Sequence, residues 1–288
     1  MVCTQMVAFG KFGILRGILY QVGMLPTLFI NHGGGPLPLL GDSSHATLIR
    51  HLKSITSTFP KPKAVLVASA HWEESVPTFI GSPQPSLLYD YYGFPPESYA
   101  IEYPAKNPVD LVETAKRLLI SRGLTSRVDL KRNYDHGVFV PLKLMYPDAD
   151  IPVMQVSLLS SRNSEQVYSL GKALAPLRKE GVLILGSGLS YHNLPSFFTA
   201  SKEKTERSLA FDTQLKEALL SPNRKALLRD WDKFAFARYC HPSEDHLMPL
   251  IFVAGAGEGE ECHIVYEDTL MGAKISGFRF GPSYDENI

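Results

Sequence analysis

The sequence contains few of the residues from which disulfides or thiolate metal sites are built. Its 288 residues include three cysteines, which neither pair evenly nor form a CxxC motif: Cys3, Cys240 and Cys262. Small secreted domains rely on paired cysteines, and closed zinc sites need closely spaced cysteines. The observed pattern therefore argues against both a disulfide framework and a closed zinc site. A reducing compartment, by default the cytoplasm, is the expected location.

An excess of charge of one sign is also absent. Lys plus Arg and Asp plus Glu number 29 each, so the net charge is zero. Proteins that bind nucleic acid or anionic membranes carry a basic excess. We therefore expect no nucleic-acid partner and no membrane partner, and a local site must carry the function.

The amino terminus lacks a long hydrophobic run. Residues 1–23 have no acidic residue, but Lys11, Arg16 and several glycines interrupt their apolar stretches. Such a segment is too broken for a spanning helix or a secretory core. We interpret it as an extension, with organelle targeting as the alternative, ahead of a domain at 24–282 and a tail at 283–288.

Short apolar runs alternate with helical patterns along the rest of the chain. Four runs rich in Val, Ile and Leu predict buried central strands: 27–31, 64–70, 152–158 and 182–188. One of the helices between them is expected to start at Pro108, capped by Asn107, and to stop at Gly123. Residues 202–234 look helical and 263–280 look like a hairpin. The alternation predicts a single α/β domain with helices covering its sheet.

Three of the nine histidines follow predicted buried strands: His32, His71 and His192. A buried strand that ends on an imidazole is unusual, and His71 stands directly after the run at 64–70. Ligands of open α/β sheets bind outside the carboxyl ends of the strands, so these side chains are expected to converge. Singly each would be a structural histidine, but together they indicate a site.

Two further segments place ligand-capable side chains in predicted loops. They are the segment 134–147, with Asp135 and His136, and the segment 239–250, with His241, Glu244, Asp245 and His246. A solvated charged turn is the alternative interpretation of the second. Two imidazoles and a third ligand leave coordination positions open, which suits catalytic zinc or ferrous iron. A further histidine nearby could act as an acid or base.

Several motifs follow one another in the chain and carry a family resemblance. They are "NHGGGP", "SAHWE", "DHGVFVPL", "GVLILGSGLSYHNL" and "HPSEDHLMPL". Together they resemble the DODA-type branch of the extradiol ring-opening dioxygenases, in the LigB-like superfamily. The resemblance implies an α/β domain with a mixed central β-sheet flanked by helices. It also implies oxygen-dependent opening of a catechol such as DOPA, with 4,5-cleavage favoured.

The resemblance also implies roles for individual histidines. His32 and His71 match the two metal histidines of the family, and His246 matches the third ligand. His192 matches the general base and is an alternative additional ligand, and His136 matches a catalytic pocket histidine that touches substrate. Fe(II) is the metal expected for activity, with Zn(II) as the alternative ion, and the partners are a small catechol and O2.

The motifs depart from the family wording at a few positions. Phe139 stands where other members carry Trp, and with Trp72 it is expected to bind substrate. Asp245 stands directly before His246, where the family motif usually has glutamate before the histidine. Glu244 is a less favoured candidate ligand.

Two alternatives to a dioxygenase remain open. One is a zinc protein of the same fold without oxygenase activity, and the other is a zinc-dependent hydrolase with Glu244 or Asp245 as base. No GxSxG motif supports a serine hydrolase. The remaining histidines are expected to be dispensable because they fall on a helix, its continuation and a terminal strand: His45, His51 and His263.

Overall fold

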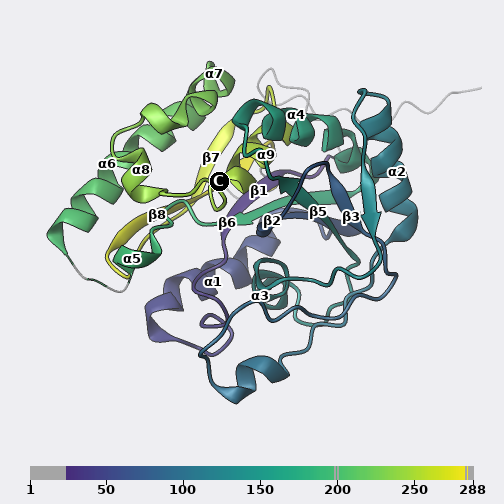
Figure 1. Cartoon of the computed structure of the whole chain (residues 1–288), viewed down its shortest axis with the longest axis horizontal. Coiled ribbons are helices and arrows are strands. Elements are labelled where there is room, and N and C mark those ends of the chain that lie inside the picture. Colours follow the sequence, from purple (N-terminus) through teal and green to yellow (C-terminus); the bar gives the residue numbers. More distant parts are fainter. Residues whose placement is uncertain (1–23, 198, 200, 283, 285–288) are drawn as a thin grey trace, which may run out of the picture.

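The fold is built around one mixed sheet of eight strands (Figure 1). The computed structural model describes residues 24–197, 199, 201–282 and 284, so the predicted extension at 1–23 lies outside the described residues. In sheet order the strands are β4 (Arg127–Asp129), β3 (Thr78–Ile80), β5 (Val153–Leu159), β2 (Ala64–Glu74), β6 (Val182–Gly188), β1 (Thr27–Asn31), β8 (Ala273–Phe280) and β7 (Cys262–Leu270).

The four central strands are the four apolar runs that the sequence predicts. β5, β2, β6 and β1 run parallel. The predicted hairpin is also confirmed, because β7 and β8 pair antiparallel, and β8 joins the sheet antiparallel to β1. The short strands β3 and β4 were not predicted, because three residues each carry too little pattern.

Helices connect the strands and cover the sheet. The α-helices are α1 (Ala46–Ser54), α2 (Val109–Ile120), α3 (His136–Met145), α4 (Ser164–Leu174), α5 (Leu194–Phe197), α6 (Lys202–Leu220), α7 (Arg224–Arg229), α8 (Ala237–Cys240) and α9 (Met248–Ala256). Short 3-10 helices are η1 (Ser43–His45), η2 (Ile55–Thr58), η3 (Pro96–Ala100), η4 (Ala175–Glu180) and η5 (Trp231–Lys233). Within the described residues, no helix is both long and apolar enough to cross a bilayer.

Adjacent residues of β6 show how both faces of the sheet are covered. Side chains alternate along a strand, so Gly186 and Ser187 face opposite layers. A Cβ on Gly186 would lie 2.3 Å from the Pro249 carbonyl oxygen of α9, whereas Ser187 Oγ donates to the Gly137 carbonyl of α3. Helices α9 and α4 therefore pack on one face, and α3 and α1 on the other (Figure 1).

The expected cap of the helix after Asn107 is wrong. The helix α2 begins at Val109, and Pro108 precedes it without a side-chain capping bond. Asn107 instead turns back to the sheet, where its Nδ2 donates to the carbonyls of Ile80 and Ser82. The residue therefore ties the start of α2 to the end of β3.

Candidate metal centre

Three histidines from separate parts of the chain meet at the carboxyl edge of the parallel strands. His32 directly follows β1, His71 lies near the end of β2, and His246 stands two residues before α9. The Nε2 atoms of His32 and His71 are 3.3 Å apart, and one ligand nitrogen from each residue lies within 4.8 Å of the others. Imidazole nitrogens bind zinc at about 2.0–2.1 Å, so nitrogens on one ion lie about 3–4 Å apart. The His32–His71 distance meets this spacing, and His246 is close enough for the group to hold one metal ion.

His71 lies inside β2 and does not terminate it, so the predicted strand end is wrong. The strand continues to Glu74, and its pairing with β5 shifts register between Ala68 and Glu73. Such an irregularity re-aims the side chains that it contains. The end of the apolar run at 64–70 marks where the continuous buried stretch of β2 ends. The backbone of β2 stays paired with β5 for several more residues, to Glu74.

Hydrogen bonds on the outer side of two rings leave their inner nitrogens free. His32 Nδ1–H donates to the Gly33 carbonyl over 2.9 Å, and His246 Nδ1–H donates to Asp245 Oδ1 over 2.6 Å. With the proton on Nδ1, Nε2 keeps its lone pair. Metal-binding histidines are commonly oriented in this way by an outer acceptor.

Burial keeps the three imidazoles neutral. It is the largest cause that lowers the pKa of His32 and of His246 well below the ordinary value, and neighbouring histidines lower both pKa values further. The pKa of His71 falls to about 4, through burial first and then through the nearby His136. A histidine must be neutral to bind a metal, so the set is available as ligands near neutral pH.

The Asp245 carboxylate connects His246 to His192. Its Oδ1 accepts from the His246 backbone N–H and Nδ1, both over 2.6 Å, and lies 3.6 Å from His192 Nδ1. Burial alone would raise the pKa of Asp245, but the nearby His192 ring and the hydrogen bonds from His246 outweigh it and lower the pKa. The two rings stack with centroids 3.4 Å apart. The structure thus places His192 beside the predicted ligands.

His136 stands at the start of α3, next to His71 and His32. Its ring centroid lies 3.9 Å from that of His71 and 5.2 Å from that of His32. Asp90 Oδ1 accepts from its Nδ1 over 2.8 Å and from its backbone N–H over 3.0 Å. Burial raises the pKa of Asp90, but the bonds from His136 outweigh it and bring that pKa to about 2. No sequence motif marks Asp90, so its place beside His136 was not predicted.

Glu244, the less favoured ligand, points away from the histidines. Its Oε1 accepts from Arg238 over 2.5 Å and its Oε2 lies 3.8 Å from Arg162. Burial opposes ionisation, but the bond from Arg238 and the charge of Arg162 lower the pKa of Glu244. The predicted assignment of Glu244 to the metal set is therefore not supported by its position.

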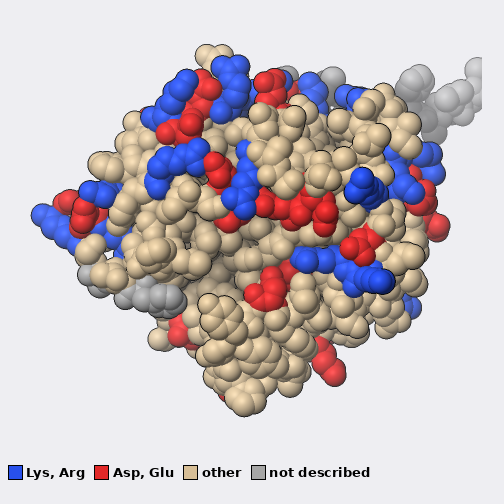
Figure 2. Space-filling view, viewed as in Figure 1, with Lys and Arg blue, Asp and Glu red and all other residues tan. Residues whose placement is uncertain are grey.

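The histidines open onto a cavity of about 690 Å³. Figure 2 shows a hollow on this face that is lined mostly by tan residues, with red acidic residues at its border. The polar part of the wall is formed by His32, His71, His136, His192, His246 and Asp245. The remaining wall is apolar or aromatic and includes Leu37, Tyr91, Tyr92, Phe94, Leu189, Leu194, Phe197 and Met271, with the glycines 33–35.

Trp72 and Phe139, which were expected to touch substrate, are not part of the cavity wall. Trp72 is buried beside Arg132 and donates to Glu74 Oε1, because its side chain leaves β2 on the side opposite to that of His71. Phe139 is fully buried behind Tyr91, with ring centroids 6.4 Å apart. The aromatic ring that faces the cavity here is that of Tyr91.

A buried network that the sequence analysis did not identify fixes the backbone of His71. The Asp135 carboxylate accepts from Ser69 Oγ, Arg132 Nη2 and Gln155 Nε2 over 2.6, 3.1 and 2.6 Å. Ser69 Oγ in turn accepts from the His71 N–H, and Arg132 donates to the His71 carbonyl. Polar residues in neighbouring strands and in the segment before α3 thus hold His71 from both sides.

His45 is a buried support for the glycine turn after His32. Its Nε2 accepts from the Gly34 N–H over 3.1 Å, and its Nδ1 donates to Asp42 Oδ1 over 2.9 Å. A Cβ on Gly33, whose φ is +83°, would lie 2.9 Å from the His45 ring. His45 does lie in a helix, the 3-10 helix η1, as the expectation that it is dispensable assumes, but its side chain is fully buried and holds the glycine turn.

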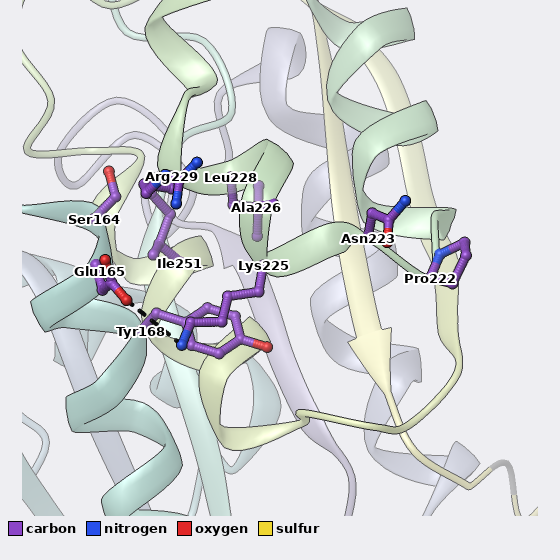
Figure 3. Close-up of a pocket in the computed structure, with 10 residues that line it drawn as sticks. All are labelled: Ser164, Glu165, Tyr168, Pro222, Asn223, Lys225, Ala226, Leu228, Arg229 and Ile251. Carbon is purple, nitrogen blue, oxygen red and sulfur yellow. Dashed lines mark ion pairs between the residues drawn. The ribbon is translucent and has the colours of Figure 1, made fainter.

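A second pocket, of about 380 Å³, lies between α4, α7 and α9 (Figure 3). Lys225 crosses it, 3.6 Å from Glu165 and with its ammonium over the Tyr168 ring. Its described lining contains no histidine or cysteine. The metal-capable cluster and this pocket are therefore separate features.

An α/β domain with an open cluster of nitrogen ligands, and no cysteine beside it among the described residues, is typical of a metal-dependent enzyme. Residues 39–278 match the family model described as the catalytic LigB subunit of aromatic ring-opening dioxygenase. The match spans most of the chain, so the chain belongs to this family, as its motifs predict. It is an oxygenase of the aromatic ring-opening type.

Similar proteins support the same assignment. Dioxygenase tasH of Hapsidospora irregularis is 36% identical over 91% of this chain and 87% of its own length. The 4,5-DOPA dioxygenase extradiol of Beta vulgaris is 36% identical over 83% and 90% of the two chains, and that of Escherichia coli is 30% identical over 86% and 91%. The crystal structure of an uncharacterized Escherichia coli protein matches with a TM-score of 0.74 at 28% identity, over 89% of this chain and all of that one.

Proposed function

We propose that this oxygenase opens the ring of a catechol beside its two hydroxyls, with ferrous iron held by His32, His71 and His246. One observation carries the proposal. The free nitrogens of these three residues converge on one point that opens to a cavity of about 690 Å³. Three ligands on one side leave the opposite side accessible to small molecules.

The donor set suits ferrous iron and does not exclude zinc. Its ligands are neutral imidazoles without thiolates, in the part of the chain that the structure describes. Neutral nitrogen ligands bind both ions, so the ligands alone do not select one. We assign ferrous iron because the proposed reaction uses dioxygen. When bound, ferrous iron supplies the one-electron chemistry that lets dioxygen react with a catechol.

His192 and His136 are the acid and base groups of the proposed reaction. Both line the cavity, and each has Nδ1 directed at a carboxylate: Asp245 for His192 and Asp90 for His136. This leaves Nε2 of each ring to exchange protons with the bound catechol. A catechol must lose protons to chelate a metal, and a positioned imidazole accelerates such a transfer by about 10²–10⁴-fold.

DOPA is the reference substrate for this proposal, with cleavage of its 4,5 bond favoured. Several relatives carry the name 4,5-DOPA dioxygenase extradiol. Cleavage there would give a semialdehyde that recyclizes without the enzyme.

The hydrolase alternative has less support than the dioxygenase. A zinc hydrolase would need a free carboxylate as base, whereas Asp245 is engaged by two histidines and Glu244 by two arginines. A zinc protein of this fold without oxygenase activity is the remaining competitor.

Anaerobic reconstitution tests the proposal. We expect protein loaded with ferrous iron to consume O2 and to form a yellow ring-opened product from DOPA or 4-methylcatechol, whereas zinc-loaded protein stays inactive. His263→Ala, at a half-exposed position in β7, serves as a control that retains activity. Iron-loaded protein that leaves every catechol intact would refute the dioxygenase assignment.

A further inference from the structure

The cavity lining has two chemically distinct parts. The histidines and Asp245 form the polar part, and the rest, here called the apolar wall, is built from leucines, aromatic rings and Met271. No lysine or arginine occurs among the described residues that line the cavity. Among the residues that the structure describes, the apolar wall therefore offers no cationic partner for an anionic group on a substrate.

Two basic side chains that contact lining residues are committed to other partners. Lys204, buried behind α5, donates its Nζ to the Ser196 and Phe197 carbonyls over 3.0 and 3.1 Å. Arg132 donates to the His71 carbonyl and to Asp135. Both cations therefore hold backbone in place and do not face the cavity.

Two polar groups of the apolar wall are uncharged and already have hydrogen-bond partners. Tyr91 Oη donates to the Ser98 carbonyl over 2.6 Å, and burial raises the pKa of Tyr91 to about 12, so the phenol stays neutral. The Gly34 N–H, in the glycine turn, is taken by His45. A substrate carboxylate would find neither a fixed cation nor these two donors.

Hydrogen bonds give the apolar wall a fixed position. Lys204 anchors α5, which carries Leu194 and Phe197. Thr205, the next residue of α6, donates to the Gly272 carbonyl and so holds the turn that carries Met271. One helix turn of α6 thus supports two separate parts of the wall.

We propose that the catechol opened by this enzyme carries a neutral, apolar substituent in place of the charged amino-acid side chain of DOPA. The inference rests on the proposed catechol cleavage and refines its substrate class. Burial of an ammonium or a carboxylate against apolar groups is costly without a partner, whereas an alkyl or ester group is favoured there. A cavity of about 690 Å³ has room for such a substituent.

A charge-matched substrate pair tests this proposal in iron-loaded enzyme. The pair is 3-(3,4-dihydroxyphenyl)propanoic acid and its methyl ester, with DOPA and 4-propylcatechol as a second pair. We expect kcat/KM for O2 uptake to be at least about tenfold higher for the neutral member of each pair. Anaerobic equilibrium binding should rank the compounds in the same order.

Two matched leucine variants localise the effect. Leu194, 59% exposed, lines the cavity, whereas Leu209, 49% exposed, lies on α6 away from it. Leu194→Lys should lower the preference for the ester over the acid by at least about threefold, because it adds a cation to the wall. Leu209→Lys should leave the preference unchanged.

The outcomes separate this inference from the proposed function. Equal or better turnover of the acid and of DOPA would overturn the apolar-substituent proposal while leaving catechol cleavage intact. An unchanged ester preference in Leu194→Lys would also overturn it. Failure to open any catechol, including 4-methylcatechol, would instead refute the function on which it rests.

Discussion

At the scale of single residues, the carboxylate of Asp245 lies beside both His246 and His192, to which we assign different roles. His246 is buried and directs its free nitrogen toward His32 and His71. His192 stacks on the outer side of His246 and faces the cavity. Both histidines lie close to the proposed metal position, so distance alone does not show which is a ligand and which is an acid–base group. Substitution of each histidine distinguishes the two roles.

Alanine variants should separate the two roles. His32→Ala and His71→Ala should lose both bound iron and activity, because each removes one of three ligands. His192→Ala should lower kcat by about 100-fold or more, as loss of an acid–base group does, while its iron content stays within about twofold of the parent. Metal analysis and O2 uptake on the same samples measure both quantities. Equal loss of iron in all three variants would show that His192 is a ligand.

At the scale of elements, glycines set how closely the helices approach the sheet. A Cβ on Gly171 of α4 would lie 1.9 Å from the Phe252 carbonyl oxygen of α9, and one on Gly255 would lie 2.0 Å from that of Tyr168. The same helix α9 packs on Gly186 of β6. Close contact at these glycines fixes α9 and hence the segment that carries His246.

Gly171→Ala should therefore destabilise the protein although alanine favours helices. The added methyl group has no space, and overpacking of this kind costs about 1–3 kcal/mol. Ser169→Ala, on the exposed side of α4, should be neutral or slightly stabilising. Urea unfolding of both variants measures the difference. If the Gly171→Ala protein were as stable as the parent, α4 and α9 could move apart without loss of stability, which would contradict the prediction.

The central strands and the edge at which the histidines meet could be predicted from the sequence. The central strands were recognisable because runs such as 64–70 are apolar without alternation, and the carboxyl ends of parallel strands bring His32, His71 and His192 to one edge. The role of Asp90 was not recognisable, because it depends on a partner 46 positions away. Trp72 and Phe139 were placed at the cavity by their neighbours in sequence, whereas side-chain direction puts them behind it.

At the scale of the whole molecule, buried neutral histidines make stability depend on pH. His241 is fully buried, its Nε2–H donates to the Ser190 carbonyl, and burial is the main cause that lowers its pKa from 6.5 to about 4. The unfolded chain therefore binds more protons than the native one below pH 6.5. Native stability is complete above that pH and falls as the pH drops toward 4.

For His241 this loss amounts to about 3 kcal/mol at pH 4. His241→Gln keeps a donor for Ser190 but cannot titrate, so the unfolding free energy of the metal-free variant should depend less on pH between 6.5 and 4. His263→Gln, at a half-exposed ring, should change the profile much less. Denaturant unfolding across this range checks the prediction, and an identical slope in the parent and His241→Gln would contradict it.

The place of β1 in the sheet has a consequence for the order of assembly. This first strand of the described chain lies between β6 and β8, so both of its neighbours are synthesised long after it. His32 follows β1, and His246 enters from a segment between the same two late strands. Because non-local pairing must wait for the distant partner, β1 is flanked only when the chain is nearly complete. The proposed ligand set is therefore complete only at the end of folding, and we predict that the finished chain, rather than the nascent one, takes up the metal.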